Sequence, residues 1–262
     1  MKIGICKLCD KESELQNSHV IGKAVFRAMM KSSNSHYLIA TSVNENIIKK
    51  SNDQFATPML CRDCESLLNA KYENYSYWVL KNKQPGVKIH KKSDYWQFKD
   101  VNQYRLAMYV VSIFWRSMVS EHVVFKNSVL SEELSNYFKN CINGKIKIDE
   151  KFFNVKISKL YCNRGYYKER ILENFILPPT LRVNHKSGFS YSMVFGGYYF
   201  EFFCGCLNSN ERLEVGFIKT NKRFLKIPFK NFLSIPEVLK SLKVTREMYD
   251  RDKELYKNLL NS

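Results

Sequence analysis

Apolar residues recur with helical spacing in several parts of the chain. For example, Ala24, Val25, Ala28 and Met29 repeat with a period near 3.6 residues, which places them on one face of a helix. The predicted helices begin near Lys23, run from Glu65 to Leu80, from Asp100 to about His122 and from Ser131 to Gly144, and begin again at Ser234. Asp100 and Ser131 are residue types that cap helix N-termini, and Ser234 is followed three residues later by Glu237, the spacing of a capping box.

Strand signals gather in the last third of the chain. Residues 190–206 are rich in aromatic side chains and are interrupted by Gly196 and Gly197, which predicts a hairpin or a bulged strand. Residues 212–219 and 223–229 are expected to complete the same antiparallel sheet. By contrast, residues 32–54 are polar and irregular and predict an insertion loop. Together these patterns indicate an α+β fold.

Proline and glycine mark breaks along the chain. The clearest is Asn82-Lys-Gln-Pro-Gly86, and Pro178-Pro179 marks a second break. We expect an N-terminal module over residues 1–82, a helical segment over residues 95–145 and an α+β region that contains the antiparallel sheet over residues 150–262.

Two short cysteine motifs, Cys6-Lys-Leu-Cys9 and Cys61-Arg-Asp-Cys64, lie in the N-terminal module. Each supplies two thiolates from one tight turn, and a fold that brings the turns together offers the four ligands of a tetrahedral Zn²⁺ site. We therefore predict one structural zinc ion bound by Cys6, Cys9, Cys61 and Cys64.

Disulfides and free core thiols are the alternatives for these cysteines. A disulfide framework fits a secreted chain, but Met1-Lys-Ile-Gly-Ile5 leads into Cys6 without an apolar signal stretch. A thioredoxin-like motif would follow a strand in a βαβ unit and would not be duplicated. Other cysteines lack this spacing, and Cys141, Cys204 and Cys206 are expected to be buried thiols.

The composition and the net charge indicate which class of partner to expect. Hydrophobic residues make up 45% of the 262 residues, which is enough for a substantial core and excludes a disordered protein. The formal net charge of +17 exceeds what solubility requires, so polyanions, above all nucleic acids, are the expected partners. Lysine spread over a solvated surface is the alternative explanation of this charge.

The longest apolar stretch, Leu106 to Val119, is too short to span a membrane and contains Ser112, Arg116 and Ser117. It is predicted to be a buried helix. Without a transit peptide or a lipidation motif, a cytoplasmic protein with no membrane partner is the default expectation.

Around the cysteines, the sequence resembles a known group of enzymes. The segment Ser18-His19-Val-Ile-Gly-Lys23 lies between the two pairs, and Leu60-Cys-Arg-Asp-Cys-Glu65 closes the module. This arrangement resembles the HNH-type, ββα-metal endonucleases, and more closely a poorly characterised bacterial branch with Ser-His-Ile-Ile-Pro-Lys and Leu-Cys-x-x-Cys-Glu motifs. In that branch a tryptophan-arginine helix follows, as Trp115-Arg116 does here. The resemblance covers about residues 5–80 and is partial to residue 120.

The resemblance implies a metal-dependent endonuclease that hydrolyses phosphodiester bonds in DNA, within a bacterial antiphage or mobile-element system. In the HNH pattern the cysteines hold structural zinc, and the histidine at the position of His19 activates the attacking water. A divalent ion, Mg²⁺ or Mn²⁺, stabilises charge on the phosphate. Glu65 stands where the family has a metal-ligating histidine, so His19 and Glu65 are the predicted catalytic residues.

Two positions depart further from the pattern. Ser18 replaces the family's aspartate and Ala56 replaces its middle asparagine. Asp53 and Glu73 are therefore candidates to complete a divalent-ion site with Glu65, since carboxylate oxygens are ligands that Mg²⁺ accepts. Two basic residues one turn apart on the next predicted helix, Lys23 and Arg27, are expected to bind backbone phosphates without reading sequence.

The alternatives to the enzyme are binding functions. Ser18 and Ala56 favour a catalytically decayed HNH fold that acts as a zinc-braced module for binding nucleic acid or a partner, whereas His19 with Glu65 favours the nuclease. A third interpretation is an interaction subunit that binds a protein through the aromatic segment Tyr198–Phe203 of the C-terminal region. Ordinary explanations also exist: His19 can cap a helix or pack on the zinc site, and helix carboxylates are usually solvated or paired with lysine.

Overall fold

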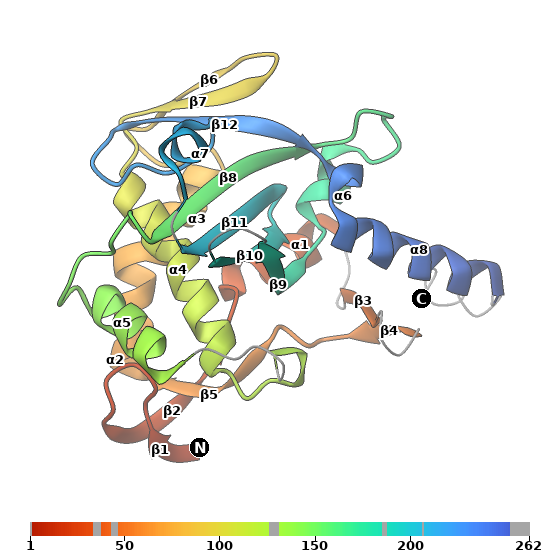
Figure 1. The fold of residues 1–262 in the computed structure, drawn as a ribbon. Helices are drawn as coiled ribbons and strands as arrows, with labels where there is room; N and C mark the ends of the chain where they lie inside the picture. The colour runs from red at the N-terminus through yellow and green to blue at the C-terminus, as the bar shows by residue number, and fades with distance from the viewer. Residues whose placement is uncertain are drawn as a thin grey trace.

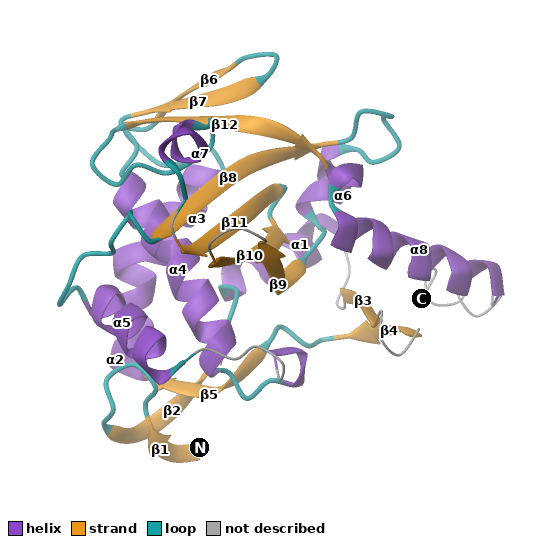
Figure 2. Ribbon diagram, viewed as in Figure 1, coloured by secondary structure: helices purple, strands orange, loops and turns teal. Residues whose placement is uncertain are grey.

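The computed structural model describes residues 2–33, 38–42, 47–125, 131–184, 188–205 and 207–251. It is a mixed α+β structure, as the sequence predicts (Figures 1 and 2). A long helix, α4 (Gln103–Val119), packs against the large sheet, and a smaller three-stranded sheet at the N-terminal end lies beyond the helices.

The N-terminal sheet has the strand order β1-β2-β5. β1 (Lys2–Ile5) and β2 (Glu12–His19) form a hairpin, and β5 (Ala56–Cys61) pairs antiparallel with β2. The β2–β5 register shifts between Gln16 and Asn17, and beyond this bulge His19 lies opposite Ala56. Helix α2 (Arg62–Leu68) begins directly after β5 and packs on β2 and β5.

The chain continues from α2 through a π-helical turn, η1 (Asn69–Glu73), into α3 (Asn74–Leu80). This confirms the predicted helix, and Leu68, Tyr72 and Val79 are buried on its inner face. A π-helical turn holds one more residue than an α-helical turn, so it rotates Glu73 by about 100° relative to an uninterrupted α-helix. The turn therefore decides which direction this carboxylate faces.

Helix α1 (Lys23–Ser33) begins at the predicted residue and buries Val25 and Phe26. The expected insertion loop over residues 32–54 is wrong in its described part, because β3 (Leu38–Ser42) and β4 (Ile47–Ser51) form a hairpin. Their isoleucines and threonine are β-branched, which favours strands despite the polar neighbours. This hairpin lies beside α8 (Pro236–Arg251) (Figure 1).

The helical segment forms α4, a 3-10 turn at Val123–Phe125 and α5 (Glu132–Asn143). The N-cap of α4 is Asn102, whose side chain accepts the Arg105 N–H, and not Asp100, which adopts a φ of 61°. α5 has its predicted ends, with Ser131 as N-cap and Gly144 in the left-handed conformation. No described helix is long and apolar enough to cross a membrane.

The large sheet has the order β6-β7-β12-β8-β11-β10-β9. Its strands are β6 (Lys88–Lys91), β7 (Tyr95–Lys99), β8 (Phe153–Tyr161), β9 (Leu177–Asn184), β10 (Gly188–Phe195), β11 (Tyr198–Gly205) and β12 (Phe224–Asn231). The predicted hairpin is confirmed, because Gly196 and Gly197, both with positive φ, join β10 to β11. The sheet is antiparallel except between β12 and β8, which run parallel.

The expected strand over residues 212–219 is wrong. Ser209–Leu213 form the short helix α7, which Asn208 and Glu211 close with a capping box, and Phe217 makes an isolated bridge to Lys156. The cap satisfies N–H groups at the start of the segment, so the helical turn prevails over its apolar residues. Another short helix, α6 (Glu169–Glu173), precedes β9.

Most aromatic residues of the segment Tyr198–Phe203 are buried. Tyr198, Tyr199, Phe200 and Phe202 are at most 2% exposed, so these rings belong to the core and offer no surface to a partner. One cluster of buried side chains runs from Cys6 in the N-terminal module through α4 to Ile227 in β12. The units expected over residues 1–82, 95–145 and 150–262 therefore all contribute to this cluster, while a second, smaller cluster lies within the third unit.

Candidate functional site

The two cysteine pairs meet at the edge of the N-terminal sheet. Cys6 and Cys9 lie in the β1–β2 turn, Cys61 ends β5, and Cys64 lies in the first turn of α2. Their four Sγ atoms lie within 4.8 Å of one another. A zinc ion with Zn–S bonds of about 2.3 Å requires sulfur–sulfur separations of about 3.8 Å. These cysteines could hold a metal ion, and the donor set is consistent with structural zinc.

Backbone N–H groups surround these sulfurs. Cys61 N–H donates to Cys6 Sγ over 3.3 Å, while the Sγ atoms of Cys9 and Cys61 are 3.9 Å apart, too far for a disulfide. Burial raises the pKa of Cys6, but N–H donors from Cys61, Cys9 and Leu8 outweigh it and lower the pKa to about 7. All four residues are free thiols, so the disulfide alternative is not observed.

His19 ends β2 and is half-buried, with its ring centroid 6.4 Å from that of Phe26. Burial is the largest cause that lowers its pKa below the ordinary 6.5, and the positive charges of Lys23 and Arg116 lower it further. The nearby Gln54 amide and Glu73 carboxylate oppose this shift. Gln54 Oε1 is buried without a well-formed hydrogen bond among the described residues. The ring is therefore neutral at neutral pH, the form that accepts a proton.

The two departures from the HNH pattern have clear positions beside His19. Ser18 is fully buried, and its Oγ accepts the Leu60 N–H over 3.1 Å and donates to the Gln16 carbonyl over 3.3 Å. Its hydroxyl thus stabilises the bulged β2–β5 pairing and is not offered to a metal. Ala56, directly opposite His19, has no polar group with which to orient the ring.

Arg116 lies at the centre of a buried network beside His19. It is 1% exposed, and its Nη1 donates to the His19 carbonyl over 2.8 Å while its Nε donates to the Ser112 carbonyl over 3.2 Å. Its Nη2 forms an ion pair with Glu73 Oε1. The other oxygen of Glu73 lies 3.0 Å from where a Cβ on Gly22 would be, so only glycine fits there without displacing the carboxylate.

Glu65 differs from the other two predicted carboxylate ligands. It lies in the first turn of α2, and its Oε1 is buried without a hydrogen-bond partner among the described residues. A buried carboxylate oxygen requires a partner, which water or a cation can supply.

Asp53 is already paired. Its Oδ2 lies 2.8 Å from His122 Nε2, and its Oδ1 accepts the Phe55 N–H over 2.8 Å. The Val124 N–H donates to the other ring nitrogen of His122, so Nε2 carries the proton that Asp53 accepts. Within the described residues, the four cysteines are the one group of three or more potential ligands that lie within 4.8 Å of one another. The structure thus does not gather Glu65, Asp53 and Glu73 into a cluster.

Lys23 and Arg27 are exposed on α1, the helix that follows His19. The charge of Lys23 reaches the His19 ring, since it contributes to lowering its pKa. The first turn of α1 carries no acidic residue, so Lys23 and the positive end of the helix dipole both attract anions. A phosphate role for both residues stays a prediction that this arrangement permits.

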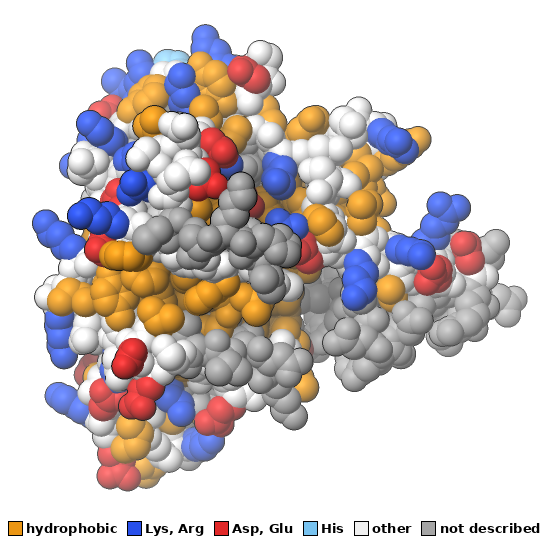
Figure 3. All heavy atoms as spheres, in the orientation of Figure 1, with side chains coloured by type: hydrophobic (Ala, Val, Ile, Leu, Met, Phe, Trp, Pro, Cys, Tyr) orange, Lys and Arg blue, Asp and Glu red, His pale blue; other side chains and the backbone are white. Residues whose placement is uncertain are grey.

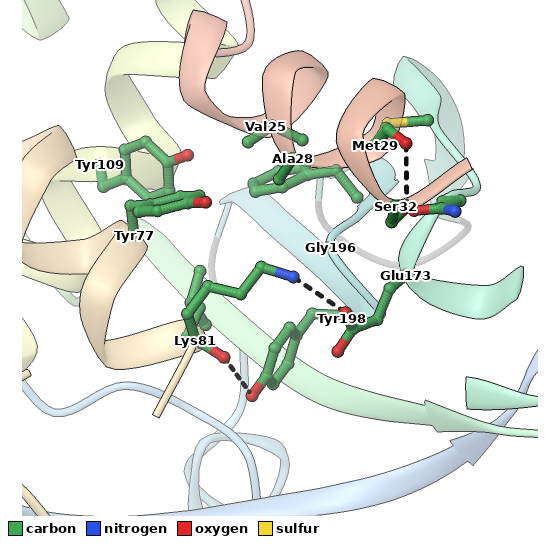
Figure 4. Close-up of a pocket in the computed structure, with 13 residues that line it drawn as sticks. Val25, Ala28, Met29, Ser32, Tyr77, Lys81, Tyr109, Glu173, Gly196 and Tyr198 are labelled. Carbon is green, nitrogen blue, oxygen red and sulfur yellow. Dashed lines mark hydrogen bonds and ion pairs between the residues drawn. The ribbon is translucent and has the colours of Figure 1, made fainter. Parts of the chain in front are cut away.

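A cavity of about 120 Å³ lies between α1, α3, α4, α6 and the β10–β11 turn (Figure 4). Lys81 and Glu173 form an ion pair of 2.9 Å in its wall, and Tyr198 donates to the Leu80 carbonyl over 3.0 Å. Tyr109, also in the wall, is buried, which raises its pKa, and the Glu73 charge adds to this effect. The predicted site residues are not among the described side chains that line this cavity.

Arg116 is the residue that the sequence-based site omits. The sequence did contain a signal for this residue, because an arginine in an otherwise apolar helix must pair with a buried partner or reach solvent. What the sequence could not supply was the partner, since Glu73 and His19 lie on other elements far along the chain.

No protein-family model, curated protein or solved structure significantly matches this chain. The resemblance to HNH nucleases, and the roles of His19, Glu65, Lys23 and Arg27, therefore stay predictions that rest on motifs and geometry.

Proposed function

We propose that this chain is a metal-dependent endonuclease in which His19 activates the water that attacks a phosphodiester bond, with DNA as the expected substrate. The observation that carries the proposal is a half-buried histidine with a lowered pKa at the end of β2, near the exposed Lys23, on a strand whose other end lies beside the four-cysteine site. A neutral imidazole near pH 7 is suited to accept the proton of the attacking water. Antiphage defence, implied by the resemblance, is the proposed setting.

The zinc ion would have a structural role. Held by Cys6, Cys9, Cys61 and Cys64, it would tie the β1–β2 turn to the start of α2. Because α2 carries Glu65 and packs on β2, which ends at His19, the ion would fix the two predicted catalytic residues relative to each other. In support of the HNH interpretation, β5 pairs antiparallel with β2 and leads directly into α2, although α1, β3 and β4 lie between β2 and β5 in the chain.

Glu65 would hold the catalytic Mg²⁺ or Mn²⁺, because its buried oxygen lacks a donor among the described residues. When bound, such an ion offsets negative charge on the phosphate. Asp53 and Glu73 would first have to leave His122 and Arg116, which makes them weaker candidates.

Arg116 would act as a positioning residue. Its hydrogen bond to the His19 carbonyl fixes the backbone that carries the base, and its ion pair holds Glu73. Lys23 and Arg27 would bind the phosphates on either side of the scissile bond, independently of sequence.

Plasmid cleavage with Mg²⁺ or Mn²⁺ tests the proposal. The native chain should nick or linearise supercoiled DNA, and His19→Ala should abolish cleavage while leaving binding to DNA in place. An exposed substitution on α1 away from the site, Lys31→Ala, serves as the control and should cleave normally. Equal cleavage by His19→Ala, or none by the native chain with either ion, would refute the enzyme.

A binding module without activity is the second candidate function. It is favoured by the buried Ser18 hydroxyl and by the lack of a polar group at Ala56. The carboxylates of Asp53 and Glu73, which are already paired with His122 and Arg116, favour it as well. In that case the native chain and His19→Ala should bind DNA equally, with no cleavage by either.

A further inference from the structure

Three neighbouring strands of the large sheet carry basic and aromatic side chains on one face. In the pairing of β6, β7 and β12, Lys88, Lys99 and Phe224 form one row across the strands, and His90, Gln97 and Lys226 form the next. We call this surface the outer face of β6–β7–β12. Alternate residues of the same strands are buried in the core, namely Trp96, Phe98, Leu225 and Ile227. Because strand side chains alternate, the two rows point away from the core.

The charge of this region is strongly positive. Residues 88–100 and 222–230 contain eight lysines and arginines and two aspartates. Lys88, Lys99 and Lys226 take part in none of the ion pairs found in the described part of the chain. On the next strand, by contrast, Lys156 pairs with Glu214. The outer face therefore keeps charge available to an anionic partner.

Aromatic rings lie among these charges. Phe224 is 43% exposed, and it lies directly opposite Lys99. On the same face, Lys226 Nζ lies 4.8 Å from the ring centroid of Tyr95. Figure 3 shows lysine and arginine side chains interspersed with hydrophobic ones over the end of the molecule formed by β6 and β7. A single exposed ring is ordinary, but a ring on a strand surface among lysines that form no ion pair has the composition of a base-stacking platform.

We propose that the outer face of β6–β7–β12 binds single-stranded nucleic acid. In a duplex the bases are stacked on one another, so an exposed phenylalanine gains little from it, whereas an unpaired base can stack on the ring. Phe224 would stack one base, and Lys88, Lys99 and Lys226 would contact the phosphates around it. This inference deepens the proposed function, because it names the form of nucleic acid that the enzyme would hold.

Fluorescence anisotropy tests this on the full chain carrying His19→Ala, which prevents cleavage during the measurement. The probes are a labelled oligothymidylate, its RNA counterpart oligouridylate, and a DNA duplex of equal length. Adding Phe224→Ala should weaken oligothymidylate binding on the order of tenfold, with little change for the duplex. Phe224→Leu, which keeps apolar volume without the aromatic ring, should show most of the same loss. Replacing Lys88, Lys99 and Lys226 with alanine should lower the slope of log K against log salt by about 2.

Matched controls lie elsewhere on the surface. Phe152 is 47% exposed, so Phe152→Ala removes a comparable ring, and the Lys145→Ala/Lys147→Ala pair removes comparable exposed charge. Both controls should bind oligothymidylate as the parent does, and thermal melting should show that each variant is folded. Equal loss with oligouridylate would extend the surface to RNA, and loss with DNA alone would confine it to DNA.

Two results would overturn the inference: unchanged oligothymidylate binding in both Phe224 variants, or tighter binding of the duplex than of the single strand. Neither depends on cleavage. If the native chain fails to cut plasmid while Phe224→Ala loses single-strand binding, the platform stands and the nuclease proposal fails. If cleavage depends on His19 while Phe224→Ala binds normally, the nuclease stands and the platform fails.

Discussion

Arg116 Nη1 donates a hydrogen bond of 2.8 Å to the backbone carbonyl of His19, 97 residues away along the chain. The same guanidinium pairs with Glu73, and both charges are largely removed from water. A buried ion pair adds little net stability over an apolar pair, but removal of one partner leaves the other charge uncompensated. Arg116 is thus the residue on which the geometry around His19 depends.

Replacing Arg116 with methionine should lower the free energy of unfolding by about 3–5 kcal/mol, because Glu73 then stays buried without a cation. Adding Glu73→Gln should recover part of this loss, with a coupling energy above about 1 kcal/mol. Urea denaturation measures both. Lys243→Met removes an exposed pair with Glu247 and should cost less than about 1 kcal/mol. A similarly small loss for Arg116→Met would show that the pair is not buried as described.

The purified protein should contain one zinc ion per chain, bound by the four cysteines with Zn–S distances of about 2.3 Å. Because such binding is coupled to folding, Cys61→Ser should give unfolded or insoluble protein, whereas substitution of the unrelated buried Cys204 by alanine should leave the zinc content unchanged. Elemental analysis and X-ray absorption measure the content and the distances. Protein that folds normally after complete removal of the metal would contradict a structural site.

The pH dependence of cleavage should reflect the lowered pKa of His19. The neutral ring is the base, so the rate should fall to half of its maximum only below pH 6.5. The free energy of unfolding should also decrease as pH falls. The ring in the unfolded chain binds its proton at a higher pH than the ring in the folded chain, so stability is lost from about pH 6.5 down to the folded pKa. His19→Gln should remove this part of the acid destabilisation. A rate that already halves above pH 6.5 would contradict the assignment.

Local signals predicted the elements whose ends are set by their own residues. α5 has its cap at Ser131 and its stop at Gly144, and Gly196-Gly197 turns the β10–β11 hairpin, because cap and turn chemistry act within a few residues. The cysteine spacing likewise sufficed to predict four close sulfurs.

Long-range pairing was beyond such reasoning. The apolar residues of 212–219 suggested a strand, but the capping box at Asn208 made a helix, and the strand beside β8 is β12, in parallel. Similarly, the sequence offered Asp53 and Glu73 as metal ligands because it could not show that His122 and Arg116 already bind them. The sequence identifies which carboxylates could bind a metal ion, but tertiary structure determines which residues they pair with.

Glu65 is the carboxylate left for a divalent ion, so Glu65→Gln should raise the Mg²⁺ concentration needed for half-maximal cleavage at least tenfold. The amide keeps the shape of the side chain but loses the charge that binds the ion. Asp63→Asn, an exposed acid in the same helical turn, is the control and should leave the requirement unchanged. The measurement is plasmid cleavage over a Mg²⁺ titration. An unchanged requirement in Glu65→Gln would exclude this residue as the ligand.

Lys23→Ala should weaken binding of duplex DNA and reduce the slope of log K against log salt by about one, because one phosphate contact and its released counterion are lost. The loss should be similar for unrelated DNA sequences, since a phosphate contact carries no sequence information. Lys31→Ala removes the same charge at the far end of α1 and should leave the slope unchanged. Anisotropy titrations at several salt concentrations separate the two variants. Because Lys23 also lowers the pKa of His19, Lys23→Ala should shift the acid limb of the cleavage profile toward higher pH, which Lys31→Ala should not do. Equal slopes for both variants would show that Lys23 does not make the phosphate contact.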